Sequence, residues 1–123
     1  MIGRPHLPSH AAIEAYGDGG FRFAGMTHSG SLLILPSGIH GWRPAAVTDI
    51  TSDDLAPIIA EKSQFTFLLI GTGRAMSLLP QFVVHYLKDG GVAVEAMDTG
   101  AGVRTYNILL AEDRPPAAAL IAV

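Results

Sequence analysis

The chain has no cysteine among its 123 residues. This absence excludes a disulfide framework, a zinc finger, an iron–sulfur cluster and a thiol nucleophile. Charged side chains are also scarce, at 15% of residues, and the net charge is −3 with only 8 lysines and arginines. Because no basic excess is present to neutralise phosphates, we expect no nucleic-acid partner.

Long apolar runs are missing as well. The longest ones, such as residues 65–70 and 117–123, are far shorter than the roughly 20 residues that span a bilayer. The first residues carry Pro5 and Pro8 where a signal peptide would have an apolar core. We therefore expect no membrane insertion and a cytoplasmic protein.

Apolar residues are abundant, at 49% of the chain, with a mean hydropathy of +0.35. This composition excludes general disorder, and the length fits one domain. We predict a loosely ordered N-terminal tail over residues 1–10 and a single α/β domain over residues 11–123. The apolar excess also suggests that some apolar surface serves a partner.

The strands follow from apolar patterns. Residues 13–16 and 21–25 alternate around a Gly/Asp turn and predict a β-hairpin. Residues 31–35 and 65–70 are continuously apolar, which is typical of strands buried on both faces. Further strands are predicted over residues 39–43, 92–97 and 117–123.

Helices are predicted between these strands. The first helix begins at Thr51 with two aspartates and ends near Lys62. The second helix has Pro80 in its first turn, and Thr99 caps the third helix. Buried strands alternating with helices indicate an α/β domain with a mixed sheet. We expect strands 65–70 and 92–97 to be central, adjacent and parallel. The side chains expected to be fully buried are Leu33, Phe67, Leu69 and Leu120.

A glycine-rich loop, Gly71-Thr72-Gly73-Arg74, follows a buried strand and precedes a helix. Backbone N–H groups at such a point can hold an anion, and ligands of α/β sheets usually lie at strand ends. However, Met76 stands where the dinucleotide fingerprint needs a small residue, and the Gly-Lys-Ser/Thr phosphate signature is absent. A tight turn that needs glycine for its backbone angles is the alternative, and no cofactor is predicted.

A second polar group is expected beside this loop, because parallel strands end at the same edge of a sheet. Its members are Glu95, Thr99, Arg104, Tyr106 and Asn107. A buried Glu95 near an arginine could act as a base or form an ion pair, and it must find a donor. The structural alternative is a Glu95–Arg104 pair, with the Tyr106 ring packed and Asn107 bonded to backbone.

Other chemistry has little support in the sequence. His6 and His10 lie in a proline-broken segment and no other histidines share ligand spacing, so no metal site is predicted. Residues 27–31 contain serines but lack the Gly-x-Ser-x-Gly elbow, so no catalytic residue is predicted. Trp42, the sole tryptophan, fits either the core or a partner contact.

With these residues in view, the chain resembles a small α/β family of uncharacterised proteins that includes the third assembly factor of mitochondrial respiratory complex I. The resemblance covers nearly everything from Tyr16 to Val123. It rests on the order and spacing of Tyr16, Gly19-Gly20-Phe21, Gly30-Ser31-Leu32-Leu33-Ile34, Pro36, Trp42, Leu69-Ile70-Gly71-Thr72-Gly73, Pro80, Gly91, Glu95-x-Met97-x-Thr99, Arg104-Thr105-Tyr106-Asn107 and Glu112-x-Arg114.

The resemblance implies a three-layer α/β fold with a central mixed sheet, flanking helices and an additional N-terminal β-hairpin. It also implies a scaffold that binds assembly proteins, without an established catalytic activity. This chain departs from the pattern at Gly102, which could loosen the last helix, and at Pro115-Pro116, which should shorten the last strand.

Two hypotheses about function follow. The first is a non-enzymatic protein-interaction module that assists assembly of a membrane or respiratory complex, and it requires exposed apolar surface. The second is a domain that binds a small molecule or an anion, either as an enzyme or as a binding protein, with its site at the Gly71-Thr72-Gly73 loop. A homo-oligomer is compatible with either hypothesis.

Overall fold

A computed structural model of the chain describes residues 5–123 and shows strands and helices in alternation. The strands are β1 (Pro5–Leu7), β2 (Ile13–Gly17), β3 (Gly20–Phe23), β4 (Met26–Ser29), β5 (Ser31–Leu35), β6 (Gly38–Trp42), β7 (Leu68–Gly71), β8 (Val94–Met97) and β9 (Ala117–Leu120). The helices are α1 (Ser52–Ala60), α2 (Gln81–Asp89) and α3 (Thr99–Ala111), with short 3-10 turns at Val47–Asp49 and Lys62–Gln64.

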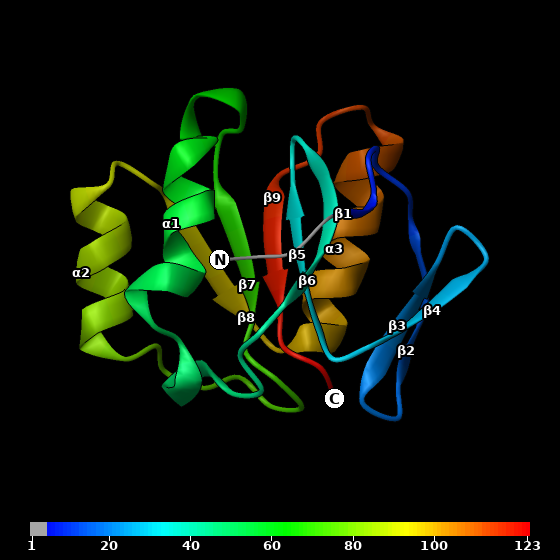
Figure 1. The fold of residues 1–123 in the computed structure, drawn as a ribbon, viewed down its shortest axis with the longest axis horizontal. Coiled ribbons are helices and arrows are strands. Elements are labelled where there is room, and N and C mark those ends of the chain that lie inside the picture. Colours follow the sequence, from blue (N-terminus) through cyan, green and yellow to red (C-terminus); the bar gives the residue numbers. More distant parts are fainter. Residues whose placement is uncertain (1–4) are drawn as a thin grey trace.

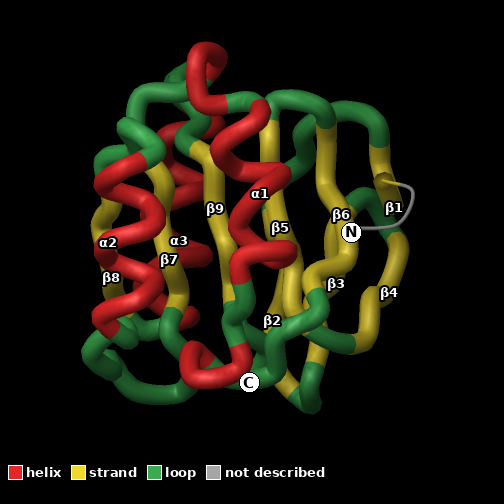
Figure 2. The backbone as a smooth tube through the Cα atoms, turned by 60° about the vertical axis from the view of Figure 1, so that its left-hand side comes forward, coloured by secondary structure: helices red, strands yellow, loops and turns green. Residues whose placement is uncertain are grey.

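The strands form a 6-stranded sheet in the order β1-β6-β5-β9-β7-β8 and a 3-stranded sheet in the order β2-β3-β4. β7 runs parallel to β8 and β9, whereas β5 pairs antiparallel with β9 and β6, so the large sheet is mixed. Helices α1 and α2 cover one face, and α3 with the small sheet covers the other (Figures 1 and 2). The expected three-layer α/β class is therefore confirmed.

Each face of the large sheet has its own apolar core. Leu33 and Leu35 of β5 point towards α1 and α2, whereas Leu32 and Ile34 point towards α3 and the small sheet. All residues of β5 are buried, as its continuous apolar run predicts. Leu33, Leu69 and Leu120 are fully buried, as expected.

The predicted hydroxyl and carboxylate pattern at the start of α1 is confirmed, and Trp42 packs beside it. The Asp54 carboxylate accepts hydrogen bonds from the Thr51 N–H at 2.8 Å and from the Thr51 hydroxyl at 3.0 Å. The same carboxylate forms an ion pair with Arg43 at 2.7 Å. Burial alone would raise the pKa of Asp54, but the bonds from Arg43 and Thr51 outweigh it and lower the pKa. The buried Trp42 indole donates to the Asp54 carbonyl at 3.1 Å, so this residue belongs to the core.

The order of strands in the large sheet differs from the expected one. β7 and β8 are adjacent and parallel as predicted, but β8 is an edge strand because β9 takes the place between β5 and β7. Phe67 precedes β7 and is only half-buried, so its expected full burial is wrong.

In the N-terminal region, one expectation needs correction and another is confirmed and extended. Residues 5–7 of the expected loose tail form β1 and pair with β6. The part of that expectation concerning residues 1–4 falls outside the described residues. The predicted hairpin is present as β2 and β3, and β4 extends it into a sheet.

Candidate functional site

The glycine loop and the start of α3 meet at the carboxyl ends of β7 and β8. The Thr72 N–H donates to the Met97 carbonyl at 2.8 Å, and the Thr99 N–H donates to the Gly73 carbonyl at 2.8 Å. The expectation that these two strand ends open at the same edge is therefore confirmed. Gly73 has a φ of +119°, a backbone angle that favours glycine.

Thr99 lies at the centre of this junction and is fully buried. Its hydroxyl oxygen accepts from the Gly73 N–H at 3.0 Å and its hydroxyl proton goes to the Ile121 carbonyl at 2.7 Å. It therefore joins β7, α3 and the end of β9. The expectation that Thr99 caps α3 is wrong, since the Asp98 carboxylate takes that role by accepting from the Ala101 N–H at 2.9 Å.

The loop is closely packed against α3. A Cβ atom on Gly71 would lie 3.0 Å from both the Thr99 Cα and a Leu120 methyl. The Thr72 hydroxyl donates to the Ala75 carbonyl at 2.9 Å and accepts from the Ser77 N–H at 3.0 Å. These bonds support the tight-turn interpretation, and an anion site at this loop stays a prediction.

The segment after the glycines differs from the expectation of an immediate helix. α2 begins only at Gln81, so no helix N-terminus stands at Gly73. Arg74 is exposed, as are Met76 and Leu78 in the same segment. The backbone geometry that would favour an anion at the start of a helix is therefore absent from residues 71–74.

Glu95 is exposed on the edge strand, and the expectation that it is buried beside a donor is wrong. The ion pairs within residues 5–123 join Arg22 to Glu14 and Arg43 to Asp54, so the expected Glu95–Arg104 pair is also wrong. The cause is sheet order, because β8 lies at the edge of the sheet, where it has a neighbouring strand on one side alone and less of the molecule packs around its side chains.

Tyr106 and Asn107 have structural roles, as the alternative interpretation predicts. The buried Tyr106 packs in the core on the α3 side and its hydroxyl donates to the Ala11 carbonyl at 3.2 Å. The Asn107 side chain accepts from the Ile13 N–H at 2.8 Å and donates to the Ile13 carbonyl at 2.9 Å. Both residues thus hold the small sheet against α3, whereas Arg104 is exposed.

Burial raises the pKa of Tyr106 to about 12, and this shift gives a testable pH dependence. The unfolded chain has a tyrosine pKa of about 10, so the neutral phenol stabilises the fold below that pH. This contribution is lost as the pH rises from about 10 towards 12. Over that interval we expect wild type to lose up to about 1.4 kcal/mol per pH unit relative to Tyr106→Phe in urea titrations.

Leu78→Ala supplies the control for this measurement, because it changes an exposed side chain and keeps all 3 tyrosines. The difference in the free energy of unfolding between wild type and Leu78→Ala should stay flat over the same pH range. A flat difference for Tyr106→Phe as well would show that the buried phenol does not resist ionisation.

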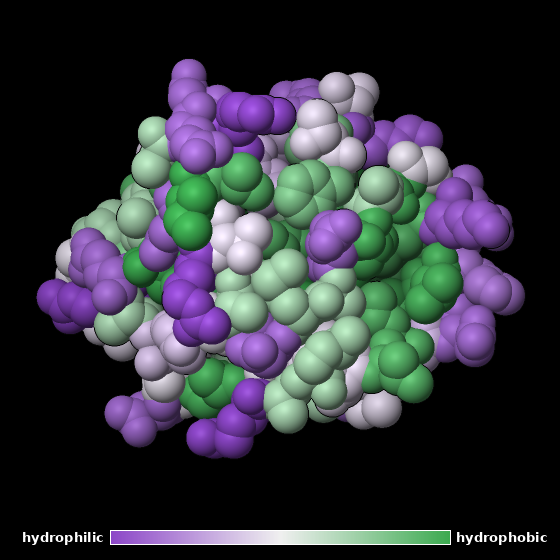
Figure 3. Space-filling view, turned by 180° about the vertical axis from the view of Figure 1, so that it is seen from behind, coloured by the Kyte–Doolittle hydropathy of each residue, from purple (hydrophilic) through white to green (hydrophobic). Residues whose placement is uncertain are grey.

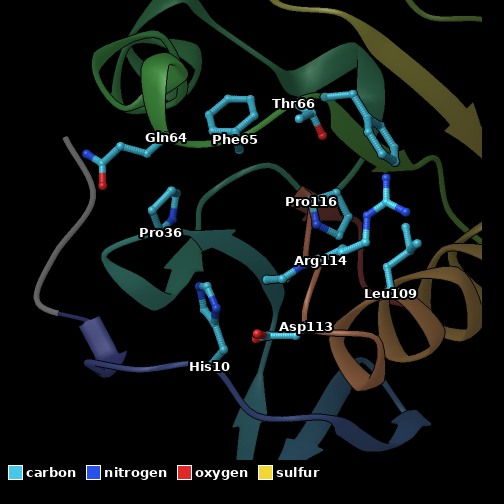
Figure 4. A pocket seen from close by; sticks show the side chains of 11 residues that line it. His10, Pro36, Gln64, Phe65, Thr66, Leu109, Asp113, Arg114 and Pro116 are labelled. Atoms are coloured by element: carbon cyan, nitrogen blue, oxygen red, sulfur yellow. The ribbon is translucent and has the colours of Figure 1, made fainter.

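A cavity of about 370 Å³ lies at the opposite end of β7 from the glycine loop, and no pattern in the sequence predicted it. In Figure 4, His10, Pro36, Phe65 and residues at the end of α3 converge on this space. The His10 Nε2 lies 2.8 Å from the Leu35 carbonyl oxygen. Asp113 has a φ of +60°, which turns the chain sharply after α3 and helps to form the cavity wall.

Exposed apolar side chains gather in one stretch of the chain, around the start of α2. They are Met76, Leu78, Phe82 and Val84, and Leu78 is 89% exposed. Seen from behind, apolar colours cover the centre and right of the molecule, and polar ones gather mainly towards the margins (Figure 3). The stretch of Met76, Leu78, Phe82 and Val84 has the exposed apolar character that the interaction-module hypothesis requires.

Within residues 5–123, no group of three or more histidine, aspartate or glutamate side chains is arranged to hold a metal ion. In the same residues no helix combines the length and apolarity needed to cross a bilayer.

Residues 13–121 match the family described as "Protein of unknown function (DUF498/DUF598)". The chain belongs to this family. It is 38% identical over 120 residues to an uncharacterized protein of Rhodobacter capsulatus, covering 95% of this chain and 91% of that protein. It is 36% identical to the Danio rerio protein named NADH dehydrogenase [ubiquinone] 1 alpha subcomplex assembly factor 3, covering 89% of this chain and 63% of that factor. These matches confirm the resemblance inferred from the sequence motifs.

The fold of the DUF498/DUF598 chain also matches solved structures. A structure titled as an outer membrane protein from Bartonella henselae superposes with a TM-score of 0.88 at 46% identity, covering 96% of this chain and 99% of that one. The family match extends from β2 to just beyond β9. Both the glycine loop and the β8 edge therefore lie within the DUF498/DUF598 domain, whereas β1 precedes the matched range.

Proposed function

We propose that this DUF498/DUF598 chain is a non-enzymatic protein-interaction module that assists assembly of a membrane or respiratory complex. The observation that carries the proposal is the exposed apolar stretch of Met76, Leu78, Phe82 and Val84. Exposed apolar side chains gathered in one place are typical of surfaces that bind other proteins.

The comparisons support the assembly part of the proposal. Relatives from Danio rerio and Homo sapiens carry the name of a complex I assembly factor. The chain spans only 63% and 59% of their lengths, so their activity as whole proteins is transferred here as a proposal. We further propose that the chain acts in the cytoplasm and binds its assembly partner there.

A co-purification experiment tests this function. We expect the tagged wild-type chain to retain protein partners from cells of its own organism. A Leu78→Glu/Phe82→Glu variant should lose them by about tenfold or more, because charge on an apolar contact opposes burial. Quantitative mass spectrometry of the eluates measures the loss.

Ile108→Glu is the matched control, because Ile108 is an exposed apolar residue on α3, on the other side of the large sheet. It should retain the partners. Equal retention by all three proteins would contradict the proposal. A small anion recovered with wild type, in place of any protein, would favour the glycine-loop hypothesis instead.

A further inference from the structure

The strand β8 has an open edge. It ends the order of the large sheet, and the described part of the chain places no strand beyond it. The Ala93 and Met97 carbonyls accept from the N–H groups of Leu68 and Thr72, each at 2.8 Å, and therefore point towards β7. Since backbone groups alternate along a strand, the N–H and C=O groups of Val94 and Ala96 point away from β7. These groups are ready to pair with another extended segment.

The opposite edge of the sheet is protected, whereas β8 is not. β1 contains Pro5, which lacks an N–H, and its register with β6 shifts between Pro5 and Leu7. Proline and irregular register are common devices against unwanted strand pairing. β8 has neither device, and it pairs with β7 in unbroken register.

Apolar hollows flank the β8 edge on both sides. The one towards α3 measures about 290 Å³ and is lined by Phe67, Ala93, Val94, Glu95, Met97 and Thr105. The one towards α2 measures about 320 Å³ and is lined by Leu79, Val84, Lys88, Val92, Val94 and Ala96. Side chains of an added strand would alternate between these two hollows.

We propose that β8 receives an extended segment of a partner protein as an added strand, with a lysine or arginine of that segment over Glu95. This inference rests on the proposed function and names the partner's chemistry. Glu95 is the one charged residue of β8 and is exposed. The ion pairs of residues 5–123 do not include it. Phe67 and Met97 beside it can cover the aliphatic stem of a basic side chain.

The other face of the added strand must be apolar. Val94 and Ala96 share their hollow with Val84 and Leu79, and the only charged group lining it is that of Lys88. The partner segment therefore alternates basic and apolar residues. A second copy of this chain fits poorly, because two antiparallel β8 strands centred on Glu95 would set like charges opposite each other. The net charge of −3 would add to that repulsion.

Amide hydrogen exchange measured by NMR tests the proposal on the full chain. The probes are two short acetylated and amidated peptides, one alternating valine with lysine and the other alternating valine with glutamate. At saturation, the lysine peptide should slow exchange of the Val94 and Ala96 amides by about tenfold or more, and the glutamate peptide should not. Amides of β4, an edge strand of the small sheet, should be unchanged.

Two variants sharpen the test. Glu95→Lys changes an exposed side chain, so it should keep the fold and reverse the preference between the peptides. Ala96→Pro removes an N–H that points away from β7 and should abolish protection by either peptide. Equal protection by both peptides, no protection, or concentration-dependent dimers through β8 without peptide would each overturn the proposal.

The two proposals fail in different ways. Protein partners that depend on Leu78 and Phe82 but remain bound to Glu95→Lys would leave the interaction-module function standing and remove strand addition at β8. Loss of those partners from Glu95→Lys, together with the peptide result, supports both proposals.

Discussion

Leu69→Ala should lower the free energy of unfolding by about 2–5 kcal/mol. Leu69 is fully buried in β7 and packs with Val103 and Tyr106 of α3 and with Leu120 of β9. Truncation loses the transfer free energy of the side chain and leaves a cavity, because the sheet on one side and α3 on the other restrict collapse. Urea denaturation followed by tryptophan fluorescence or circular dichroism measures the change.

Leu78→Ala is the matched control, because it makes the same truncation at a side chain that is 89% exposed. We expect a change within about 0.5 kcal/mol there. A similarly small effect for Leu69→Ala would mean that β7 does not lie between the two cores.

Gly102 packs against Leu69 and therefore offers a second test of the Leu69→Ala prediction. A Cβ atom there would lie 3.1 Å from a methyl group of Leu69 and 3.1 Å from one of Leu120, so α3 packs closely on the sheet at this point. This close approach explains a glycine at position 102, whereas the expected loosening of the start of α3 stays a prediction. Gly102→Ala should be less unfavourable in the Leu69→Ala background than in wild type, and a double-mutant cycle measures that coupling.

Local patterns predicted most of the elements, because the information lies within each segment. The apolar run of residues 31–35 coincides with β5, and the carboxylates after Thr51 mark the start of α1. Pro115-Pro116 ends just where β9 begins. Each of these signals depends on burial or capping of residues close together in the chain.

The order of strands could not be predicted in the same way. The apolar patterns of residues 92–97 and 117–120 both fit buried strands, and only the packed sheet shows that β9 lies inside and β8 at the edge. The placement of Glu95 depends on that order. A strand predicted to be central led to a buried carboxylate, whereas an edge strand leaves it exposed.

Long-range polar contacts were hidden for a similar reason. Asn107 bonds both backbone groups of Ile13, at a separation of 94 residues. A helical asparagine carries no local sign of such a partner, so the sequence could only offer backbone bonding as one alternative. The same applies to the cavity near His10, whose walls come from segments distant in the chain.

Thr99→Val should also destabilise the chain, by about 2–6 kcal/mol, although the two side chains have nearly the same shape. The Thr99 hydroxyl accepts from the Gly73 N–H and donates to the Ile121 carbonyl, and Thr99 is fully buried. Valine removes both bonds and leaves two backbone groups unsatisfied at the junction of β7, α3 and the chain after β9. Each such buried group costs about 1–3 kcal/mol.

Two controls separate the hydroxyl from the packing at this position. Thr99→Ser keeps both hydrogen bonds and should recover most of the stability, whereas Thr105→Val loses only a contact to the Met97 sulfur at 3.6 Å and should be nearly neutral. Thermal and urea unfolding of the three variants measure these differences. Equal stability of Thr99→Val and Thr105→Val would show that the hydroxyl does not hold the loop. Weakened anion binding with unchanged stability would instead make Thr99 part of a ligand site at Gly71–Gly73.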